Sequence, residues 1–311
     1  MIIKFLKNTC YYSIFLILCL TIAQLLISYR IKGKLVSGND NWDTTANIND
    51  DLVLLGSSRC WAHFDPTFFE EEFNLKTVNL GMNGHSKLSA IQLRLENYLA
   101  KNKAPKFVIL SFDPFTKPQN NLPNKSLIDK NKYSRFAFMP TKENEALVNY
   151  FGFNSEEKYI PLYAIFKYKL LGDCITLNKS NLYLKGFEMN DEVWDTTKSP
   201  VNDEMKKYFF KENEIQILKK QLNDFNIFCK KKNIKLICIQ TPVYKVLYNE
   251  KNFEQSISIC RNNNIKIIDA NYEKIRNNSD YFYNTNHLNK NGVIEMNKLL
   301  KNEKELINFL K

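Results

Sequence analysis

The chain of 311 residues lacks the usual means of holding a metal ion. It has only three histidines (His63, His85 and His287), and none stands at a metal-ligand spacing from a cysteine or from another histidine. The seven cysteines contain no CxxC pair. Because zinc sites are built from closely spaced Cys and His ligands, the sequence predicts no metal site. Beyond the N-terminal segment we expect buried free thiols at Cys60, Cys174, Cys229, Cys238 and Cys260.

The chain also lacks a phosphate-binding loop. None of its nine glycines falls in a G-x-G-x-x-G or G-x-x-x-x-G-K pattern, which argues against a nucleotide-binding module. The net charge is +11, but the lysines are scattered among asparagines and isoleucines rather than gathered in one patch. We therefore expect no cofactor and no nucleic-acid partner, although a basic surface favours anionic membranes or anionic polymers.

The N-terminal segment carries one long uncharged run. Residues 8–29 contain no charged side chain and are rich in Ile, Leu and aromatic residues. A membrane-spanning helix needs about 20 apolar residues, and no small-x-small cleavage pattern follows the run. We interpret 1–32 as an uncleaved membrane anchor, with a buried helix as the alternative. Basic residues flank both ends, so the positive-inside rule does not set the orientation. We expect the soluble domain outside the cytoplasm only because the anchor and a family resemblance favour that side.

After a polar stretch at 33–50, which is typical of a linker, short apolar runs alternate with segments of helical period. Strands are predicted at 52–55, 77–80, 107–110, 235–240 and 265–268. Helices are predicted at 68–73, after Ser86, from Pro161, at 212–231, at 253–260 and in one terminal helix through Ile307. Regular alternation is interrupted at about 114–211, which we interpret as an insertion within a domain spanning 51–311.

Alternating strands and helices predict an α/β fold: a three-layer αβα, flavodoxin-like parallel sheet covered on both faces. Ligands of such sheets bind outside the carboxyl ends of the strands. Four polar segments fall at predicted strand ends: Gly56–Ser58, Gly81–Ser86, Asp113 and the loop that carries His287. We expect these segments to meet at one edge of the sheet.

A serine and a histidine from two of these segments have the chemistry of a nucleophile and its base. Ser58 follows the first strand at the start of a helix, where backbone N–H groups are available to negative charge. His287 stands on a polar loop directly before the last apolar face, which we expect to begin at Leu288. A serine hydroxyl needs a base within hydrogen-bond reach. The alternatives are that Ser57 and Ser58 only cap the helix and that His287 is an ordinary surface residue.

The order of these segments resembles the SGNH, or GDSL-like, hydrolase superfamily. Gly56-Ser57-Ser58 stands where that family has G-D-S, and Asn284-Thr285-Asn286-His287 where it has D-x-x-H. The stretch from Asn79 to Ser86 is similar to the second block, with Gly84 as its glycine, and Asp113 stands nearest the asparagine of the third block. The resemblance covers about 51–115 and 212–310.

The resemblance implies roles for these residues. Ser58 would be the nucleophile, His287 the base and Asn284 the third member, while Ser58, Gly84 and Asp113 would occupy the oxyanion-hole positions. The chain departs from the family at Asn284, where the family has aspartate, and at Asp113, whose carboxylate would repel an oxyanion. Either another carboxylate such as Asp280 replaces the missing charge, or catalysis is slow or lost.

Other side chains are candidates for contact with substrate. Arg59, Asn83 and His85 lie at the same predicted edge, and Arg59 has a structural role as its alternative. Aromatic residues of the insertion can stack on sugar rings or belong to the core; they are Tyr159, Tyr163, Phe166 and Trp194. Membrane-anchored members of the resembled family imply acylation or deacylation of cell-surface polysaccharide. The expectation is therefore a serine esterase or O-acyltransferase on an acylated saccharide or small ester, or else a catalytically impaired domain that binds glycan or assembles with export machinery.

Overall fold

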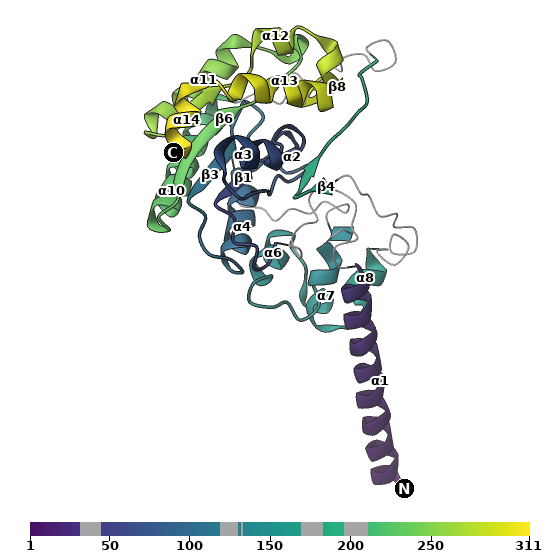
Figure 1. The fold of residues 1–311 in the computed structure, drawn as a ribbon. Helices are drawn as coiled ribbons and strands as arrows, with labels where there is room; N and C mark the ends of the chain where they lie inside the picture. The colour runs from purple at the N-terminus through teal and green to yellow at the C-terminus, as the bar shows by residue number, and fades with distance from the viewer. Residues whose placement is uncertain (32–44, 119–129, 132, 169–182, 196–210) are drawn as a thin grey trace. The chain divides into compact units, whose positions relative to one another are not determined.

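The structure, a computed structural model, describes the chain except for residues 32–44, 119–129, 132, 169–182 and 196–210 (Figure 1). It divides into two compact units. One combines Met1–Val36 with Asn121–Lys179, and the other combines Ser37–Asn120 with Ser180–Lys311. The predicted anchor thus shares a unit with much of the predicted insertion. The described end of the predicted linker is packed in the second unit, where the backbone N–H of Asp50 donates to the Tyr98 hydroxyl over 2.8 Å.

The second unit is built on a five-stranded sheet in the order β2-β1-β3-β6-β7. The strands are β1 (Leu52–Leu55), β2 (Thr77–Asn79), β3 (Phe107–Ser111), β6 (Lys235–Gln240) and β7 (Lys266–Asp269), and all neighbours pair in parallel. This is the flavodoxin-like order. The predicted α/β class and its parallel sheet are confirmed.

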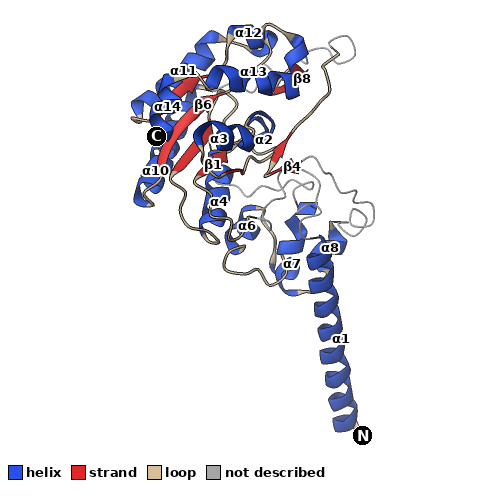
Figure 2. Ribbon diagram, in the orientation of Figure 1, coloured by secondary structure: helices blue, strands red, loops and turns tan. Residues whose placement is uncertain are grey.

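Helices cover both faces of this sheet (Figure 2). On one face lie α2 (Ser58–His63), α3 (Pro66–Phe73), α12 (Glu273–Arg276), α13 (Lys290–Leu300) and α14 (Lys304–Leu310). On the other lie α4 (Leu88–Leu99), α10 (Glu212–Lys231) and α11 (Glu250–Asn262). Alternate β1 residues explain the two layers, because Leu52 and Leu54 enter one cluster and Val53 and Leu55 the other.

Short elements complete this unit. The hairpin of β4 (Tyr183–Leu184) and β5 (Phe187–Glu188) is antiparallel, as is that of β8 (Phe282–Asn284) and β9 (His287–Leu288). Two 3₁₀ helices, η3 (Lys245–Leu247) and η4 (Ser279–Tyr281), lie in connections between larger elements.

The terminal helix differs from the prediction. Leu288 belongs to β9, and the helix begins after Asn289, whose side chain caps it by accepting from the Gly292 N–H over 3.1 Å. A turn at Lys301–Asn302 then separates α13 from α14, with Glu303 in extended conformation as the N-cap of α14. Buried Leu300 and Leu306 continue one apolar pattern across this turn, which explains why the sequence favoured a single helix.

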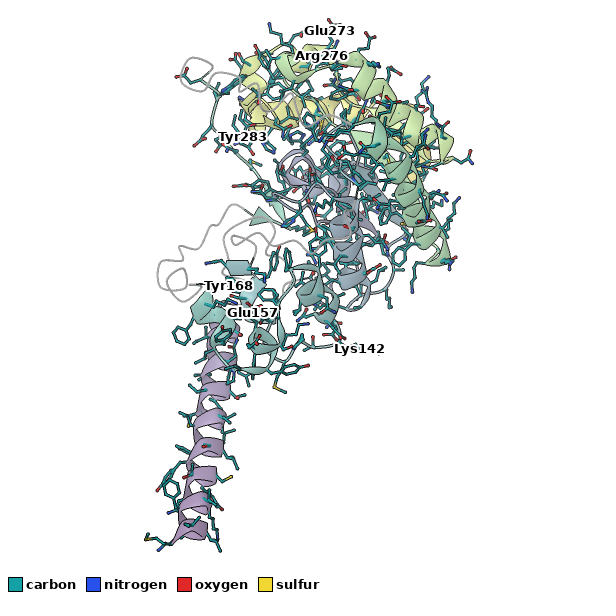
Figure 3. The ribbon with its side chains drawn as sticks, turned by 180° about the vertical axis from the view of Figure 1, so that it is seen from behind. Lys142, Glu157, Tyr168, Glu273, Arg276 and Tyr283 are labelled. Atoms are coloured by element: carbon teal, nitrogen blue, oxygen red, sulfur yellow. The ribbon has the colours of Figure 1, made fainter. Side chains whose placement is uncertain are left out.

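The described residues of the first unit include α1 (Ile2–Ile31) and the short helices η1 (Ser134–Phe136), α6 (Glu145–Tyr150), α7 (Ser155–Tyr159) and α8 (Tyr163–Lys167). By length and composition, α1 can cross a membrane over Ile2–Ser28. The buried carboxylate of Glu157 holds the short helices together: it pairs with Lys167 at 2.7 Å and accepts from the Tyr168 hydroxyl, which Figure 3 shows beside it. The helix predicted from Pro161 is α8, which starts two residues later.

The thiols largely follow the expectation. Cys60, Cys229, Cys238 and Cys260 are free and buried, and burial raises the pKa of the Cys60 and Cys238 thiols well above the usual value. Cys60 and Cys238 are therefore protonated packing residues. Cys174 lies outside the described residues.

Candidate active site

Ser58 lies at the point where the chain leaves β1 and enters α2. Gly56 makes this turn with φ of 154°, and a Cβ there would come within 2.7 Å of side-chain atoms of Cys60 and Ser111. Ser57 is the N-cap, because its hydroxyl accepts from the Arg59 N–H. Since Ser57 caps the helix, the Ser58 hydroxyl is available for another partner.

That partner is His287. The Ser58 Oγ lies 2.8 Å from the His287 Nε2, across 229 positions of sequence. Both side chains are partly exposed. The structure thus brings together the two residues on which the sequence analysis depended, at the hydrogen-bond distance that a nucleophile and base require.

Asn284 fixes the tautomer of this imidazole. Its Oδ1 accepts from the backbone N–H of Asn286 at 2.9 Å and of His287 at 3.0 Å. Two backbone donors require the amide oxygen, not the NH₂, at this position. The same oxygen lies 3.1 Å from His287 Nδ1, so Nδ1 carries the proton and donates. Nε2 is consequently the lone-pair nitrogen that faces Ser58.

The charge that an aspartate would bring to His287 is missing. Among the residues that the structure describes, no hydrogen bond or ion pair joins His287 to a carboxylate, and the Asp280 side chain is exposed. Burial and the nearby Arg59 guanidinium lower the pKa of His287 from 6.5 to about 3. The imidazole is therefore neutral at physiological pH, and its protonated form is poorly stabilised.

Tyr283 lies on the other side of the imidazole. Its ring is stacked on that of His287 with centroids 5.3 Å apart and an interplanar angle of 7°, and Figure 3 labels it. A tyrosine face attracts positive charge on a stacked group. It is therefore a partial source of stabilisation for an imidazolium at His287.

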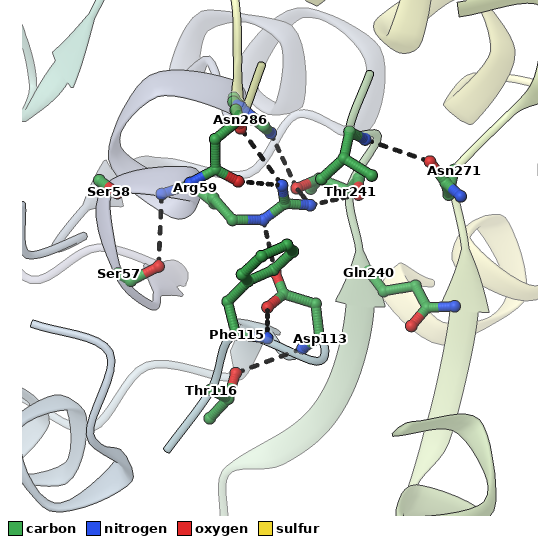
Figure 4. A network of polar contacts seen from close by, with 12 residues as sticks. Ser57, Ser58, Arg59, Asp113, Phe115, Thr116, Gln240, Thr241, Asn271 and Asn286 are labelled. Carbon is green, nitrogen blue, oxygen red and sulfur yellow. Dashed lines mark hydrogen bonds and ion pairs between the residues drawn. The ribbon is translucent and has the colours of Figure 1, made fainter. Parts of the chain in front are cut away.

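Arg59 forms hydrogen bonds to three loops of the site (Figure 4). Its Nε donates to Asp113 Oδ2 at 2.6 Å, its Nη1 to the side chain of Asn286 at 3.0 Å, and its Nη2 to Thr241 Oγ1 at 3.0 Å. Only 1% of its surface is exposed. Arg59 thereby connects the ends of β3 and β6 to the β8–β9 turn, which agrees with the structural alternative weighed for it.

Asp113 is the ion-pair partner of this arginine. One of its carboxylate oxygens accepts from Arg59, and the other accepts from the Phe115 N–H at 2.9 Å. The side chain is buried. A carboxylate held by donors has no hydrogen to offer an oxyanion. The geometry places Asp113 as the counter-ion of Arg59 rather than as an oxyanion-hole donor.

His63 is a second buried histidine that the sequence analysis did not place at the site. Its Nε2 accepts from the Leu288 N–H at 3.0 Å, so Nδ1 is protonated and donates to Thr241 Oγ1 at 2.8 Å. Burial lowers its pKa well below the usual value. By holding the backbone next to His287, His63 positions that loop. The available signal was its spacing of four from Arg59, which puts both on one helix face.

The segment Asn79–Ser86, which is similar to the second block, lies against the turn Gly56–Ser58. The Met82 N–H donates to the Gly56 carbonyl at 2.9 Å, and Ser57 forms a parallel bridge with Met82. Gly84 has φ of +80°, while a Cβ there would meet nothing within 4 Å. Its left-handed conformation rather than space favours glycine. The neighbouring His85 is 4% exposed, and Asn83 is partly exposed.

The aromatic candidates of the insertion separate into two groups. Trp194 is buried and packs edge-on against Tyr244 with centroids 5.0 Å apart, so its interpretation as core is confirmed. Tyr159, Tyr163 and Phe166 are exposed and belong to the unit that contains α1, so their interpretation as core is wrong. Within the described ranges, no group of three or more His, Cys, Asp or Glu side chains is arranged to hold a metal ion.

Comparison with known proteins gives no match to a family model or to a curated protein sequence. Several solved structures are similar to the chain, among them the following three. One, assigned as an acylhydrolase from Bacteroides fragilis NCTC 9343, has 12% identity and a TM-score of 0.38, with 86% of this chain and 91% of that chain covered. One assigned to the lipolytic G-D-S-L family, from Desulfitobacterium hafniense DCB-2, has 11% identity and a TM-score of 0.39, with coverage of 80% and 97%. An acetyl xylan esterase has 13% identity and a TM-score of 0.37, with coverage of 79% and 96%.

Proposed function

We propose that this chain is a serine ester hydrolase of the SGNH type, anchored to a membrane by α1. The observation that carries the proposal is the relay from Asn284 through His287 to Ser58, with distances of 3.1 Å and 2.8 Å. The resemblance of the segments Gly56–Ser58, Asn79–Ser86 and Asn284–His287 to that family supports it, as does the position of the first two segments at the carboxyl ends of the parallel strands β1 and β2.

The reaction follows from the tautomer. The His287 Nε2 takes the proton of Ser58 while the Ser58 Oγ bonds to the ester carbonyl carbon. The resemblance implies that the backbone N–H groups of Ser58 and Gly84 stabilise the resulting oxyanion. When the intermediate collapses, the leaving alcohol receives the proton from His287 and the acyl group remains on Ser58. His287 then deprotonates water, whose oxygen bonds to the acyl carbon; when the bond from that carbon to Ser58 Oγ breaks, His287 returns the proton to Ser58 and the acid is released.

We extend the proposal to the class of substrate and to the acceptor of the acyl group. We assign an acylated cell-surface glycan or lipid-linked saccharide as substrate, on the family resemblance and the membrane helix. If a sugar hydroxyl replaces water in the second half-reaction, the same residues carry out O-acyl transfer. Product analysis with an acetylated oligosaccharide and a non-acetylated acceptor separates the two, because only transfer gives a newly acetylated acceptor.

Asn284 sets the expected rate. It orients His287 as an aspartate would, but it adds no negative charge to stabilise the imidazolium. With a His287 pKa of about 3, proton transfer from Ser58 is uphill. We therefore expect an active but slow enzyme.

This weakness supports the second candidate, an impaired SGNH-like domain that binds glycan. A fluorophosphonate probe, which phosphonylates an activated serine, separates the two. The esterase predicts labelling of the wild type and of Ser57→Ala, the adjacent control, and no labelling of Ser58→Ala. Absence of labelling in folded wild-type protein would favour the binding domain.

We place the catalytic unit outside the cytoplasm. An alkaline phosphatase fusion after residue 40 is expected to be active. An inactive fusion expressed at a normal level would reverse the topology while leaving the ester chemistry untouched.

A further inference from the structure

The short helices beside α1 carry large apolar side chains that face solvent. Within the first unit, Tyr159 is 72% exposed, Phe166 60% and Met139 65%. Ile160 and Tyr163 are also exposed. Isolated apolar residues at a surface are normal, but a cluster of aromatic and apolar residues marks an interaction site.

These residues are joined to α1 by a defined contact. Leu162 and Ile165 of the α8 region pack on Leu20, Ala23 and Ile27 of α1. Tyr163 and Phe166 follow Leu162 and Ile165 by one position each and are separated by three. They therefore share the neighbouring face of α8.

A polar contact fixes the junction. Gln24, which is 2% exposed, accepts at Oε1 from the Leu162 N–H over 2.8 Å and donates from Nε2 to Ser28 at 3.1 Å. The buried amide is thus satisfied within the protein. This contact sets the position along α1 at which the short helices pack.

The position of this contact along α1 corresponds to a membrane boundary. Every residue from Ile2 to Cys19 is exposed, and the first covered position is Leu20. The free part of α1, about 18 residues, is about 27 Å long at 1.5 Å per residue, against about 30 Å for a bilayer hydrocarbon core. Lys4 and Lys7 stand in the first two turns of this part, where long side chains reach back to the headgroups at the N-terminal end of the helix. With this part spanning the core, Leu20–Gln24 and the helices docked there lie at the opposite headgroup boundary.

Met139 adds a backbone observation. It is exposed at φ of 44°, a conformation in which a long side chain is uncommon. Its N–H donates to the Lys158 carbonyl at 2.8 Å, which places it beside Tyr159.

We infer that this apolar surface, formed by Met139, Tyr159, Ile160, Tyr163 and Phe166, inserts into the interfacial layer of the membrane that α1 spans. The occupant is the lipid bilayer at headgroup depth, where aromatic side chains are enriched. The inference rests on the anchoring part of the proposed function and not on ester chemistry.

Tryptophan quenching by brominated lipids tests this inference, with the bromine near the headgroup to report on the boundary and deep in the acyl chain to report on Tyr12, which lies about 12 Å from Leu20 along α1. The full chain is reconstituted in phosphatidylcholine vesicles with and without bromine, and the wild-type emission is subtracted. Phe166→Trp reports on the apolar surface and Tyr12→Trp on α1. Ile227→Trp is the control, because Ile227 is an exposed residue of α10 in the other unit.

We expect Phe166→Trp and Tyr12→Trp to lose emission in brominated lipid and Ile227→Trp to keep it. Quenching of Tyr12→Trp without quenching of Phe166→Trp would overturn the inference and leave the anchor intact. A blue-shifted but unquenched Phe166→Trp would overturn it in favour of a protein occupant, such as a second copy. If neither Phe166→Trp nor Tyr12→Trp is quenched, the membrane anchor is overturned as well. The fluorophosphonate test of Ser58 does not depend on that result.

Discussion

Asn284→Asp restores the charge that the site lacks, and its effect is derivable from the geometry. The new carboxylate keeps the acceptor oxygen that receives the Asn286 and His287 N–H groups and faces Nδ1 at 3.1 Å. An opposite charge this close raises a histidine pKa by about 1–3 units, which is about 1.4–4 kcal/mol of imidazolium stabilisation.

The rate follows from that free energy. The reverse change in the serine protease triad lowers kcat about 10⁴-fold, in part through the wrong tautomer. Here the tautomer is already correct, so only the charge is gained, and we expect kcat/KM to rise by about 10- to 1000-fold. Because the active form of His287 is neutral, the acid limb of kcat/KM moves up with its pKa by about 1–3 units.

Hydrolysis of 4-nitrophenyl acetate by the full chain between pH 3 and 9 measures both effects. Asn278→Asp is the matched control: it adds the same charge nearby, but its side chain accepts from the Asp280 N–H rather than facing the imidazole. Unchanged or lower activity of Asn284→Asp, with an unaltered thermal midpoint, would refute the role of Asn284 as the third member. An equal gain in the control would show a general charge effect.

Three further predictions concern the surroundings of the relay. Arg59→Met leaves the buried Asp113 carboxylate unpaired and should lower the free energy of unfolding by about 3–5 kcal/mol. In denaturant titration, the double variant with Asp113→Asn should recover part of this loss. If the losses of the two single variants simply add in the double variant, the pairing of Arg59 with Asp113 is contradicted. Folded His287 stays neutral down to a pKa of about 3, whereas the unfolded residue protonates below about pH 6.5, so stability falls as pH drops through that window. His287→Gln should reduce this slope, by at most about 1.4 kcal/mol per pH unit, in urea titrations at several pH values; an identical slope would refute it. Tyr283→Leu should lower kcat about 2- to 5-fold by removing a face worth about 0.5–1 kcal/mol to an imidazolium, while Tyr283→Phe should keep the wild-type rate; equal losses in both would point to the hydroxyl instead.

Local patterns were sufficient to predict the sheet. Each strand is a short apolar run ended by a turn residue or polar segment, and buried parallel strands require such runs on both faces. The strand at 235–240 agrees in both bounds with β6. The position of Ser58 at the carboxyl edge of the sheet followed from topology, whereas His287 reaches Ser58 from the antiparallel β8–β9 hairpin rather than from a loop directly after a parallel strand.

The remaining features depend on long-range contacts that no local pattern encodes. Asn284 was judged from its residue type alone, and the two N–H groups that orient its amide appear only when the β8–β9 turn is folded. The roles of Arg59 and His63 depend on Thr241, about 180 positions away. The contact between α1 and Leu162 joins segments 138 positions apart through Gln24, which the sequence analysis treated only as part of an apolar run.

The central claim is that Ser58 carries the acyl group. Acid quenching after brief exposure of the full chain to 4-nitrophenyl acetate, followed by peptide mass spectrometry, should show acetylation at Ser58 in the wild type and none at that peptide in Ser58→Ala. Turnover of the ester with the acetyl group on a different residue, or with Ser58→Ala as active as the wild type, would contradict the account.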